Sequence, residues 1–269
     1  MYTPELELQL LPILRTMGKP VVVNDSGEAA EALEEFAERA PKTGKGGRKR
    51  PFDVDRDIRV EVWNGDDASV ELADAMIEAK LLKPSTVEQF FEELADLQDW
   101  EKAAAFYAVT DLGYTDMTDI ALKVRDELRP MDGDAKEYVQ DYIDGMGGVG
   151  ELGEDVILAH FDYEKFGRDI RSDEENRLQE NIEEAEADGD EEQVENLREY
   201  LEELEAKSDQ EFGEHFADEY GTSELATLLG DNLEHYFDLD SWVRDWEAGG
   251  DLTSFEFDGR TWTISAHEG

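Results

Sequence analysis

The 269-residue chain carries 71 acidic and only 25 basic side chains, which gives a formal net charge of −46 at neutral pH. Carboxylates without Lys or Arg partners repel one another, so a fold that keeps them accepts a stability cost. A hydrophobic fraction of 39% is nonetheless enough for a core, which argues against wholesale disorder. Because the charge destabilises the fold, we expect that it serves a function.

The same charge limits the partners of the chain. DNA-binding proteins need a basic face to displace counterions, and an anionic membrane surface would repel this chain. We therefore expect neither direct nucleic-acid binding nor membrane binding. The chain has no cysteine, which excludes disulfides, thiolate catalysis and cysteine-ligated metal sites. The sequence does not start with a basic segment followed by an apolar one, and no apolar stretch approaches about 18 residues. We therefore expect a protein of the host cytoplasm.

The acidic residues are unevenly distributed along the chain. Residues 1–60 hold 11 acids and 10 bases, whereas residues 61–269 hold 60 acids and 15 bases. We place a boundary near residue 55 and treat residues 1–55 as a small near-neutral module. Its pattern predicts an apolar segment, then a strand over Val21–Val23, then a helix near Glu28–Arg39.

The acidic part begins with a strand, because Ile58, Val60 and Val62 alternate with charged residues. Amphipathic helices are predicted to follow. At the other end of the chain, two alternating segments joined by Asp258-Gly259 predict a β-hairpin.

Residues 172–207 predict an acidic helical hairpin. Ser172 and Glu175 have the spacing of a capping box, and Asp188-Gly-Asp190 supplies the turn. Between residues 174 and 205 there are 15 acids and two arginines, a net charge of −13. The first helix has an apolar stripe and the second a coiled-coil seam, formed by Leu178, Ile182 and Ala185 and by Val194, Leu197, Leu201 and Leu204.

A segment of 11 residues occurs twice, 76 positions apart. His160–Ile170 (HFDYEKFGRDI) recurs as Tyr236–Trp246 (YFDLDSWVRDW), and we interpret the pair as a duplication. Each copy has an Asp at an N-cap position and the aromatic spacing of a hydrophobic staple. Each is therefore expected to begin a helix and to fix it to a core. The motif residues are Phe161, Asp162, Phe166, Arg168, Asp169, Phe237, Asp238, Trp242, Arg244 and Asp245.

These copies and their surroundings resemble the ArdA family of antirestriction proteins. Members end with an acidic helix, an aromatic-Asp-Tyr-Glu-x-Phe-x-Arg-Asp segment and a short β-hairpin, and the stretch from Glu211 to Ile264 matches that order. The stretch from Asp111 to Ile170 is similar to a second copy. The resemblance spans roughly residues 58–269, and this chain is longer than a typical member.

The resemblance implies a protein of a phage, plasmid or conjugative transposon. Its members mimic bent B-form DNA, often as dimers, and occupy the DNA groove of type I restriction-modification enzymes. The hairpin over residues 172–207 would be an insertion, and residues 1–55 have no counterpart in the family.

We therefore predict an α+β fold, predominantly helical and elongated, built from two or three small modules with short strands and a helical hairpin. The expected divisions are a near-neutral α/β module (1–55), an ArdA-like acidic module (56–171), the hairpin (172–207) and a C-terminal ArdA-like acidic module that ends in a β-hairpin (208–269). The expected core includes Phe161, Phe166, Phe237, Trp242 and Trp262.

Mimicry of DNA also has a physical basis independent of the family. Duplex DNA carries about one charge per 1.7 Å of axis, so a net charge of −46 corresponds to roughly 78 Å, a little over about 20 base pairs. Carboxylates three or four residues apart on a helix lie about 5–6 Å apart, close to the along-strand spacing of phosphates. The rows expected to bind a partner contain Glu174, Glu175, Glu183, Glu184, Asp188, Glu191, Glu195, Glu199, Glu202, Glu203, Glu211, Glu214, Asp218 and Glu219.

The acidic charge is open to alternative interpretations. The same mimicry would inhibit a CRISPR effector or another nucleic-acid-binding protein. A halophilic protein of unrelated interaction function would also be acid-rich, although the near-neutral first 60 residues argue against a proteome-wide bias. A calcium site is disfavoured, because Asp53–Asp57 begins like an EF-hand loop but lacks its Gly and its final Glu. An enzyme is disfavoured, because the four histidines accompany no recognisable catalytic motif.

The sequence thus predicts a non-enzymatic inhibitor that occupies the basic DNA-binding groove of a host defence protein. We expect no catalytic residue, no cofactor and no metal. A homodimer is one expected state, and the near-neutral module would serve either dimerisation or direct contact with the target.

Overall fold

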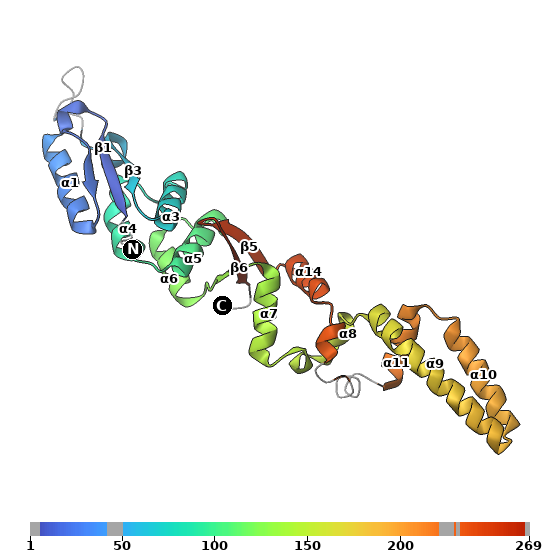
Figure 1. The fold of residues 1–269 in the computed structure, drawn as a ribbon. Coiled ribbons are helices and arrows are strands. Elements are labelled where there is room, and N and C mark those ends of the chain that lie inside the picture. The colour runs from blue at the N-terminus through green and yellow to red at the C-terminus, as the bar shows by residue number, and fades with distance from the viewer. Residues whose placement is uncertain (1–5, 42–50, 221–228, 230–231, 267–269) are drawn as a thin grey trace. The chain divides into compact units, whose positions relative to one another are not determined.

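The computed structural model of the chain describes residues 6–41, 51–220, 229 and 232–266. Contacts divide the chain into two units, which we name unit 1 (residues 1–135 and 247–269) and unit 2 (residues 136–246). Helices predominate among the described residues, and the strands there form two sheets of three strands each (Figure 1). The predicted α+β class with mostly helical content is confirmed.

The first sheet of unit 1 has β1 (Glu7–Pro12) at its centre, flanked by β2 (Val21–Val23) and β3 (Ile58–Asn64), both antiparallel to it. Leu8 and Leu10 of β1 are fully buried on one face, where α1 (Ser26–Arg39) covers the sheet. In β1 and β3, every second side chain is thus apolar and faces the core, as the two-residue period of a strand requires.

The predicted boundary near residue 55 is wrong. β1 belongs to the expected module 1–55, yet it pairs with β3 from Pro12 opposite Ile58 to Glu7 opposite Asn64. One apolar core includes residues from both sides of the boundary, such as Phe36 and Phe90. Most of the charged side chains are exposed, so the change in charge at this point does not mark the end of a core.

The remaining helices of unit 1 pack around this core. Some of them begin at an Asp whose side chain accepts a hydrogen bond from a backbone N–H group, for example Asp66 from Ser69 and Asp116 from Thr118. The elements are η1 (Arg15–Met17), α2 (Val54–Asp57), α3 (Asp67–Glu78), η2 (Pro84–Thr86), α4 (Val87–Glu93), α5 (Asp99–Thr110) and α6 (Met117–Asp126).

The second sheet contains the predicted C-terminal β-hairpin. β5 (Leu252–Phe257) and β6 (Arg260–Ser265) are joined by Asp258 and Gly259, which both have positive φ, as the tight hairpin turn requires; β4 (Met131–Asp132) pairs with β6. Phe257 and Trp262 are buried in the core of unit 1. The predicted C-terminal module 208–269 is therefore wrong, because these apolar side chains attach the hairpin to unit 1 while residues up to 246 belong to unit 2.

Unit 2 is helical except for one isolated β-bridge in its described part. Because the first segment of unit 1 ends at Ala135, the expected module 56–171 is divided between the two units. The elements of unit 2 are α7 (Ala135–Met146), η3 (Val149–Glu151), α8 (Glu154–Ala159), α9 (Tyr163–Asp188), α10 (Glu191–Glu205), α11 (Asp209–Tyr220), α13 (Leu233–Tyr236) and α14 (Leu239–Gly249).

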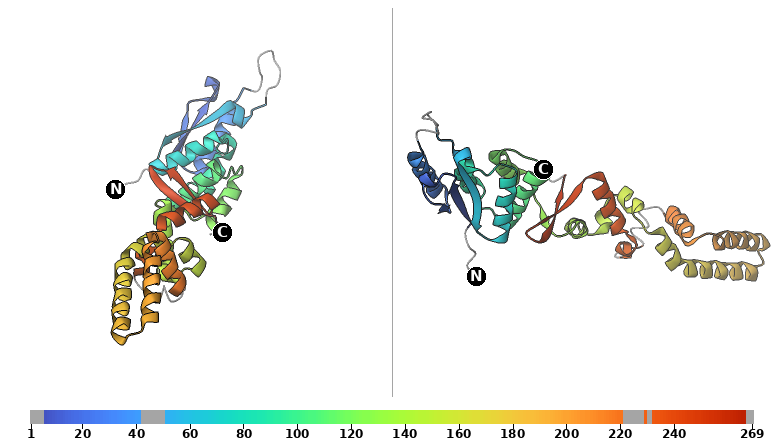
Figure 2. Two further views of the ribbon diagram at one scale, coloured as in Figure 1. Left: turned by 90° about the vertical axis from the view of Figure 1, so that its right-hand side faces the viewer. Right: turned by 90° about the horizontal axis from the view of Figure 1, so that it is seen from above.

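The predicted helical hairpin is formed by α9 and α10, which lie side by side (Figures 1 and 2). Gly189 ends α9 in the left-handed conformation with φ of 73°, and Asp190 caps α10 by accepting a hydrogen bond from the backbone of Gln193. The apolar residues meet between the helices. Those on α9 are buried and those on α10 are half-buried or buried, namely Leu178, Ile182, Ala185, Val194, Leu197, Leu201 and Leu204.

The predicted start of the hairpin at residue 172 is wrong. α9 begins at Tyr163, inside the first motif copy, and continues through Ser172 without a break. Asp162 caps this helix, so Ser172 lies on an exposed helical face, and Glu175 pairs with Arg171 within the helix. A Ser-x-x-Glu spacing also occurs within a continuous helix, where it carries no capping role.

α11 crosses α9 at an unusually short distance, because a glycine lies on each helix at the crossing. A Cβ atom on Gly167 would lie 1.9 Å from the carbonyl oxygen of Asp209, and one on Gly213 would lie 2.0 Å from that of Tyr163. The two backbones therefore touch directly. Phe212 and Phe216 of α11 are fully buried beside the crossing.

We expect Gly167→Ala to lower the free energy of unfolding of unit 2 by more than about 3 kcal/mol, because the added methyl group forces the two helices apart. Urea denaturation followed by circular dichroism measures this. Gly145→Ala in α7 is the matched control, since a Cβ there meets nothing within 4 Å and should stabilise the helix by about 0.5–1 kcal/mol. Equal stability of the two variants would contradict the close crossing.

Candidate partner-binding surface

The two motif copies lie against each other in unit 2. Phe161 and Phe237 form an antiparallel β-bridge. The backbone N–H of Asp162 donates to the carbonyl of Tyr236, and that of Asp238 donates to the carbonyl of His160, both at 2.7 Å. Because residues 160–162 of one copy correspond to residues 236–238 of the other, the two hydrogen bonds are equivalent when the copies are exchanged. This local two-fold symmetry supports the interpretation as a duplication.

The aromatic rings around the bridge follow the same symmetry. In each copy the motif Phe contacts a ring of its own helix and the first ring of the opposite copy, so two equivalent clusters of three rings form. Each is buried or half-buried. The centroid distances are 5.3 Å for Phe161–Phe166, 5.8 Å for Phe161–Tyr236, 5.5 Å for Phe237–Trp242 and 6.1 Å for Phe237–His160.

Two polar motif residues, Asp162 and Asp238, cap helices as predicted. Asp162 and Asp238 accept hydrogen bonds from the backbone of Lys165 and Ser241, each at 2.9 Å, and so cap α9 and α14. Asp169 accepts a hydrogen bond at 3.4 Å from the hydroxyl of Tyr236, and burial together with this carboxylate raises the pKa of that tyrosine.

Asp245 takes the position of Asp169 in the second copy, 3.7 Å from Nε2 of His160. Arg168 and Arg244, which also correspond, are exposed. All five aromatic residues predicted to be core are buried, namely Phe161, Phe166, Phe237, Trp242 and Trp262.

Four of the predicted carboxylates form a row on one face of α10. They are three or four residues apart and exposed, and none of them has a Lys or Arg within ion-pair distance among the described residues. The apolar seam lies on the other side of the helix. Glu203, beside the row, is exposed and pairs with Lys207 at 3.0 Å. The row consists of Glu191, Glu195, Glu199 and Glu202.

A second row lies on α9, facing away from its buried stripe. Glu184 and Asp188 are exposed there as predicted, and Glu183 is exposed beside them. Asp173 and Glu180 share this face and were missed by the sequence analysis. Their spacing of seven residues is two helical turns, a signal that becomes visible only once α9 is known to be continuous.

Glu174 and Glu175 do not belong to the exposed rows, so their assignment is wrong. Both are half-buried, and they lie 2.6 Å from Arg177 and 3.5 Å from Arg171, respectively. They face the interior side of α9, where the helix packs against its neighbours. A nearby guanidinium neutralises each charge, so neither contributes an unpaired carboxylate.

α11 contributes fewer free carboxylates than predicted. Glu211 accepts hydrogen bonds from the backbone and the hydroxyl of Ser208, which lower its pKa, and the Ser208 hydroxyl in turn accepts from the backbone of Glu211. This is a capping box. Glu214 accepts from Gln210, and Asp218 is exposed. The side chain of Glu219 lies outside the described residues.

An arginine holds the hairpin and α11 together. The guanidinium of Arg171 donates to the carboxylate of Asp209 at 2.9 Å and to the carbonyl of Lys207 at 3.0 Å, and it lies over the ring of Phe212 at 4.4 Å. It thus contacts α9, the turn after α10, and α11. One of the few cations of the unit is therefore used inside the scaffold, which leaves the outer acidic rows without a counter-charge.

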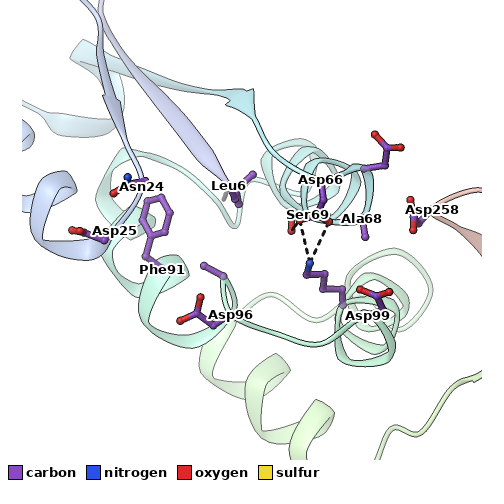
Figure 3. A pocket seen from close by; sticks show the side chains of 13 residues that line it. Leu6, Asn24, Asp25, Asp66, Ala68, Ser69, Phe91, Asp96, Asp99 and Asp258 are labelled. Atoms are coloured by element: carbon purple, nitrogen blue, oxygen red, sulfur yellow. Dashed lines mark hydrogen bonds and ion pairs between the residues drawn. The ribbon is translucent and has the colours of Figure 1, made fainter. Parts of the chain in front are cut away.

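Unit 1 has an acidic cavity of about 740 Å³ that the sequence analysis missed (Figure 3). Nζ of Lys102 in α5 lies 3.2 Å from Oδ1 of Asp66 and is buried at the side of the cavity. The carboxylates come from segments far apart in the sequence, so no local spacing predicts that they gather here. They belong to Asp25, Asp66, Asp67, Asp96, Asp99 and Asp258.

Several cavity carboxylates already have partners within unit 1. Asp25 caps α1 by accepting from the backbone of Glu28 at 2.7 Å, and Asp99 and Asp258 both contact Arg260. Burial alone would raise the pKa of Asp66, but hydrogen bonds from Ser69 and the charge of Lys102 outweigh it, so the pKa lies below its usual value. Among the described residues, no group of three or more His, Asp or Glu is arranged to hold a metal ion.

Comparison with known proteins gives no match to a protein-family model, to a curated protein or to a solved structure. The ArdA resemblance therefore depends on the motif residues and on the order of the elements. In the described part of the chain, no helix combines the length and the apolar character needed to cross a membrane.

We expect Asp66→Asn to lower the free energy of unfolding at pH 7 by about 1–3 kcal/mol, because Lys102 is then buried without a counter-charge while the capping function of residue 66 is kept. A carboxylate whose pKa is lowered by folding stabilises the fold above its unfolded pKa, and this contribution disappears as the pH falls through the folded pKa. The difference from the unmodified protein should therefore shrink in acid.

Urea denaturation at neutral pH and near about pH 3 measures both effects. Asp96→Asn is the control, because Asp96 is exposed beside the same cavity; it should change stability by less than about 0.5 kcal/mol at either pH. If Asp66→Asn lowers the free energy of unfolding equally at both pH values, charge pairing with Lys102 is not the cause of the loss.

Proposed function

We propose that this chain is a non-enzymatic DNA mimic that occupies the basic DNA-binding groove of a host defence protein. A type I restriction-modification enzyme is the first expected target, because the motif copies resemble the ArdA family. A CRISPR effector would present a similar basic groove and is the second. The proposed mechanism is competition: carboxylate rows on the helices take the place of DNA phosphates.

The charge density of the hairpin carries this proposal. Residues 174–205 have a net charge of −13, and α10, which spans the hairpin, has 15 residues. At about 1.5 Å per residue the two antiparallel helices cover about 22 Å of axis. The hairpin therefore presents about one net charge per 1.7 Å, which equals the linear charge density of duplex DNA.

The arrangement of the carboxylates adds support. The row on α10 and the row on α9 point away from the apolar seam between the helices, so both face solvent. Within the described residues, the cations nearest to these rows pair with other acids, as in Arg198–Glu186 and Lys207–Glu203. A basic groove thus meets carboxylates that no internal cation neutralises, and their repulsion is relieved on binding.

The order of the elements is consistent with the resemblance. The acidic helix α11, the second motif copy at the start of α14 and the hairpin of β5 and β6 follow one another as in the C-terminal region of the ArdA family. The first motif copy departs from this order, because it runs directly into the long helix α9. This departure affects the expected identity of the target more than the charge mechanism.

A pull-down from host lysate with the full chain tests the proposal and names the target. The bound proteins are washed with a series of buffers of increasing salt concentration, from about 0.1 to about 1 M. Over this range the distance at which salt screens charges falls from about 10 to about 3 Å. A DNA mimic should retain a nuclease or methyltransferase complex that salt releases and that duplex DNA displaces. If no partner competes with DNA and the protein unfolds at low salt, the charge is instead a halophilic coat.

We expect neutralisation of the α10 row to weaken inhibition of the target at least about tenfold, whereas any single Glu→Gln change should have less than about a twofold effect, because a distributed field has no single anchor. The measurement is displacement of labelled DNA from the purified target by increasing inhibitor. The variant combines Glu191→Gln, Glu195→Gln, Glu199→Gln and Glu202→Gln.

A matched control removes the same number of charges from α1 in unit 1. Four exposed carboxylates there are changed to amides, which leaves the net charge equal to that of the α10 variant while the hairpin is intact. This control should stay within about twofold of the unmodified inhibitor. Equal weakening of both variants would show that net charge, and not the row on α10, determines binding. The control residues are Glu31, Glu34, Glu35 and Glu38.

A further inference from the structure

The two motif copies share the same residue at four of their 11 positions, which hold a Phe, an Asp, an Arg and a second Asp. Three of these positions have a role inside unit 2. The two Phe residues pair in the β-bridge, the first Asp of each copy caps a helix, and the second Asp faces Tyr236 or His160. The fold therefore accounts for the identity of these three positions.

The arginine of each copy has no such role. Arg168 and Arg244 are exposed, and within the described residues neither side chain forms a hydrogen bond or an ion pair. Each follows an acid by four residues, Glu164 or Asp240, which is the spacing of an intrahelical pair. Asp240 instead pairs with Lys136 at 2.7 Å. Exposed side chains without contacts contribute little to stability, so the fold does not account for the identity of this position.

The remaining cations of unit 2 all have a partner. In the described part of the unit, each of them forms a hydrogen bond or an ion pair. The two that form neither are thus the two that correspond in the duplication. Because residues 61–269 hold 60 acids and only 15 bases, an arginine without a carboxylate partner is the exception here. The cations with partners are Lys136, Lys165, Arg171, Arg177, Arg198 and Lys207.

The chemistry of the two side chains indicates what they bind. A guanidinium presents a planar fork of N–H donors that matches a carboxylate or a phosphate. The net charge of −46 repels the phosphates of nucleic acid, whereas an Asp or Glu on a basic protein is a local exception in an attractive surface. The local two-fold symmetry of the copies relates the two arginines as well. A partner protein therefore meets both arginines with a carboxylate at each.

Such pairs would add specificity that the carboxylate rows lack. Any basic groove attracts a row of carboxylates, so the rows by themselves do not select a target. An arginine that meets an Asp or Glu of the correct protein adds binding there. Against another basic groove the same arginine meets a cation and is repelled.

We propose that Arg168 and Arg244 are specificity-determining residues that pair with carboxylates of the target protein beside its basic groove. This inference rests on the proposed function, because it takes the partner to be a DNA-binding protein. The acidic rows supply the attraction to the groove, and the two arginines distinguish the target from other proteins with a basic groove.

Charge reversal separates these two contributions. The variant with Arg168→Glu and Arg244→Glu is four charges more negative than the unmodified chain. It should bind the target recovered in the pull-down at least about twentyfold more weakly, and each single reversal about fivefold, measured by displacement of labelled DNA. On immobilised polylysine, which offers cations alone, the double variant should elute at the same or a higher salt concentration.

A matched control reverses two arginines of unit 1. Arg59 and Arg125 are also exposed, and their side chains form no hydrogen bond or ion pair within the described residues, but neither belongs to a motif copy. The variant with Arg59→Glu and Arg125→Glu has the same net charge as the motif variant. It should bind the target within about twofold of the unmodified chain. All four positions are exposed, so circular dichroism should show unchanged melting.

Lysine at the two motif positions identifies the group that is contacted. Arg168→Lys and Arg244→Lys keep the charge and supply an amine, which a carbodiimide joins to a neighbouring carboxylate. Mass spectrometry of the treated complex should find residue 168 or 244 joined to an Asp or Glu of the target. If these lysines join only carboxylates of their own chain, the inference is wrong.

The outcomes separate this inference from the proposed function. If DNA displaces the target but the double reversal binds it as tightly as the unmodified chain, or if the control loses as much affinity, the arginine contact is wrong and mimicry stands. If DNA does not displace the captured protein while the reversal weakens its binding, mimicry is wrong and the arginine contact stands. Capture of no protein would overturn both.

Discussion

Mutual repulsion of carboxylates is the constraint on which the rest of the structure depends. With only 25 basic residues against 71 acidic ones, the fold cannot neutralise its surface, and it places several cations at junctions between elements instead. Arg171 joins α9 to α11, Lys102 joins α5 to the start of α3, and Arg260 joins β6 to Asp99 of α5. The pairs of Arg171 and Lys102 are partly buried and therefore stronger than exposed ones, whereas the pair of Arg260 with Asp99 is exposed. The outer helical faces are left with an excess of negative charge.

The pairing of the two motif copies organises unit 2 with few contacts. A single β-bridge at Phe161 and Phe237, two backbone hydrogen bonds and two clusters of rings join the first turns of α9 and α14. The copies differ where their helices meet other elements. Gly167 allows α11 to touch the backbone of α9, whereas the equivalent residue of the second copy is Val243, whose side chain would prevent such an approach. One copy therefore supports the acidic hairpin and the other does not.

Predictions from local patterns agree with the structure wherever the pattern acts through neighbouring residues. The cap at Asp162, the turn at Gly189 and the hairpin at Asp258-Gly259 all form, because each depends on backbone geometry within a few residues. The exposed row on α10 was also predictable, since its spacing follows from the helical period. The capping box at Ser172 was wrong because an upstream cap at Asp162 had already started the helix.

The sequence by itself determined the charge, the helical and strand periods, the caps and turns, and the aromatic residues of the core, because these depend on composition and short-range geometry. Only the tertiary structure decided which elements share a core. β1 pairs with β3 across the expected boundary, the C-terminal hairpin packs in unit 1, and Glu174 and Glu175 turn toward arginines. The physical reason is that burial and ion pairing join residues distant in the chain, and no local spacing encodes which distant surface an apolar face will meet.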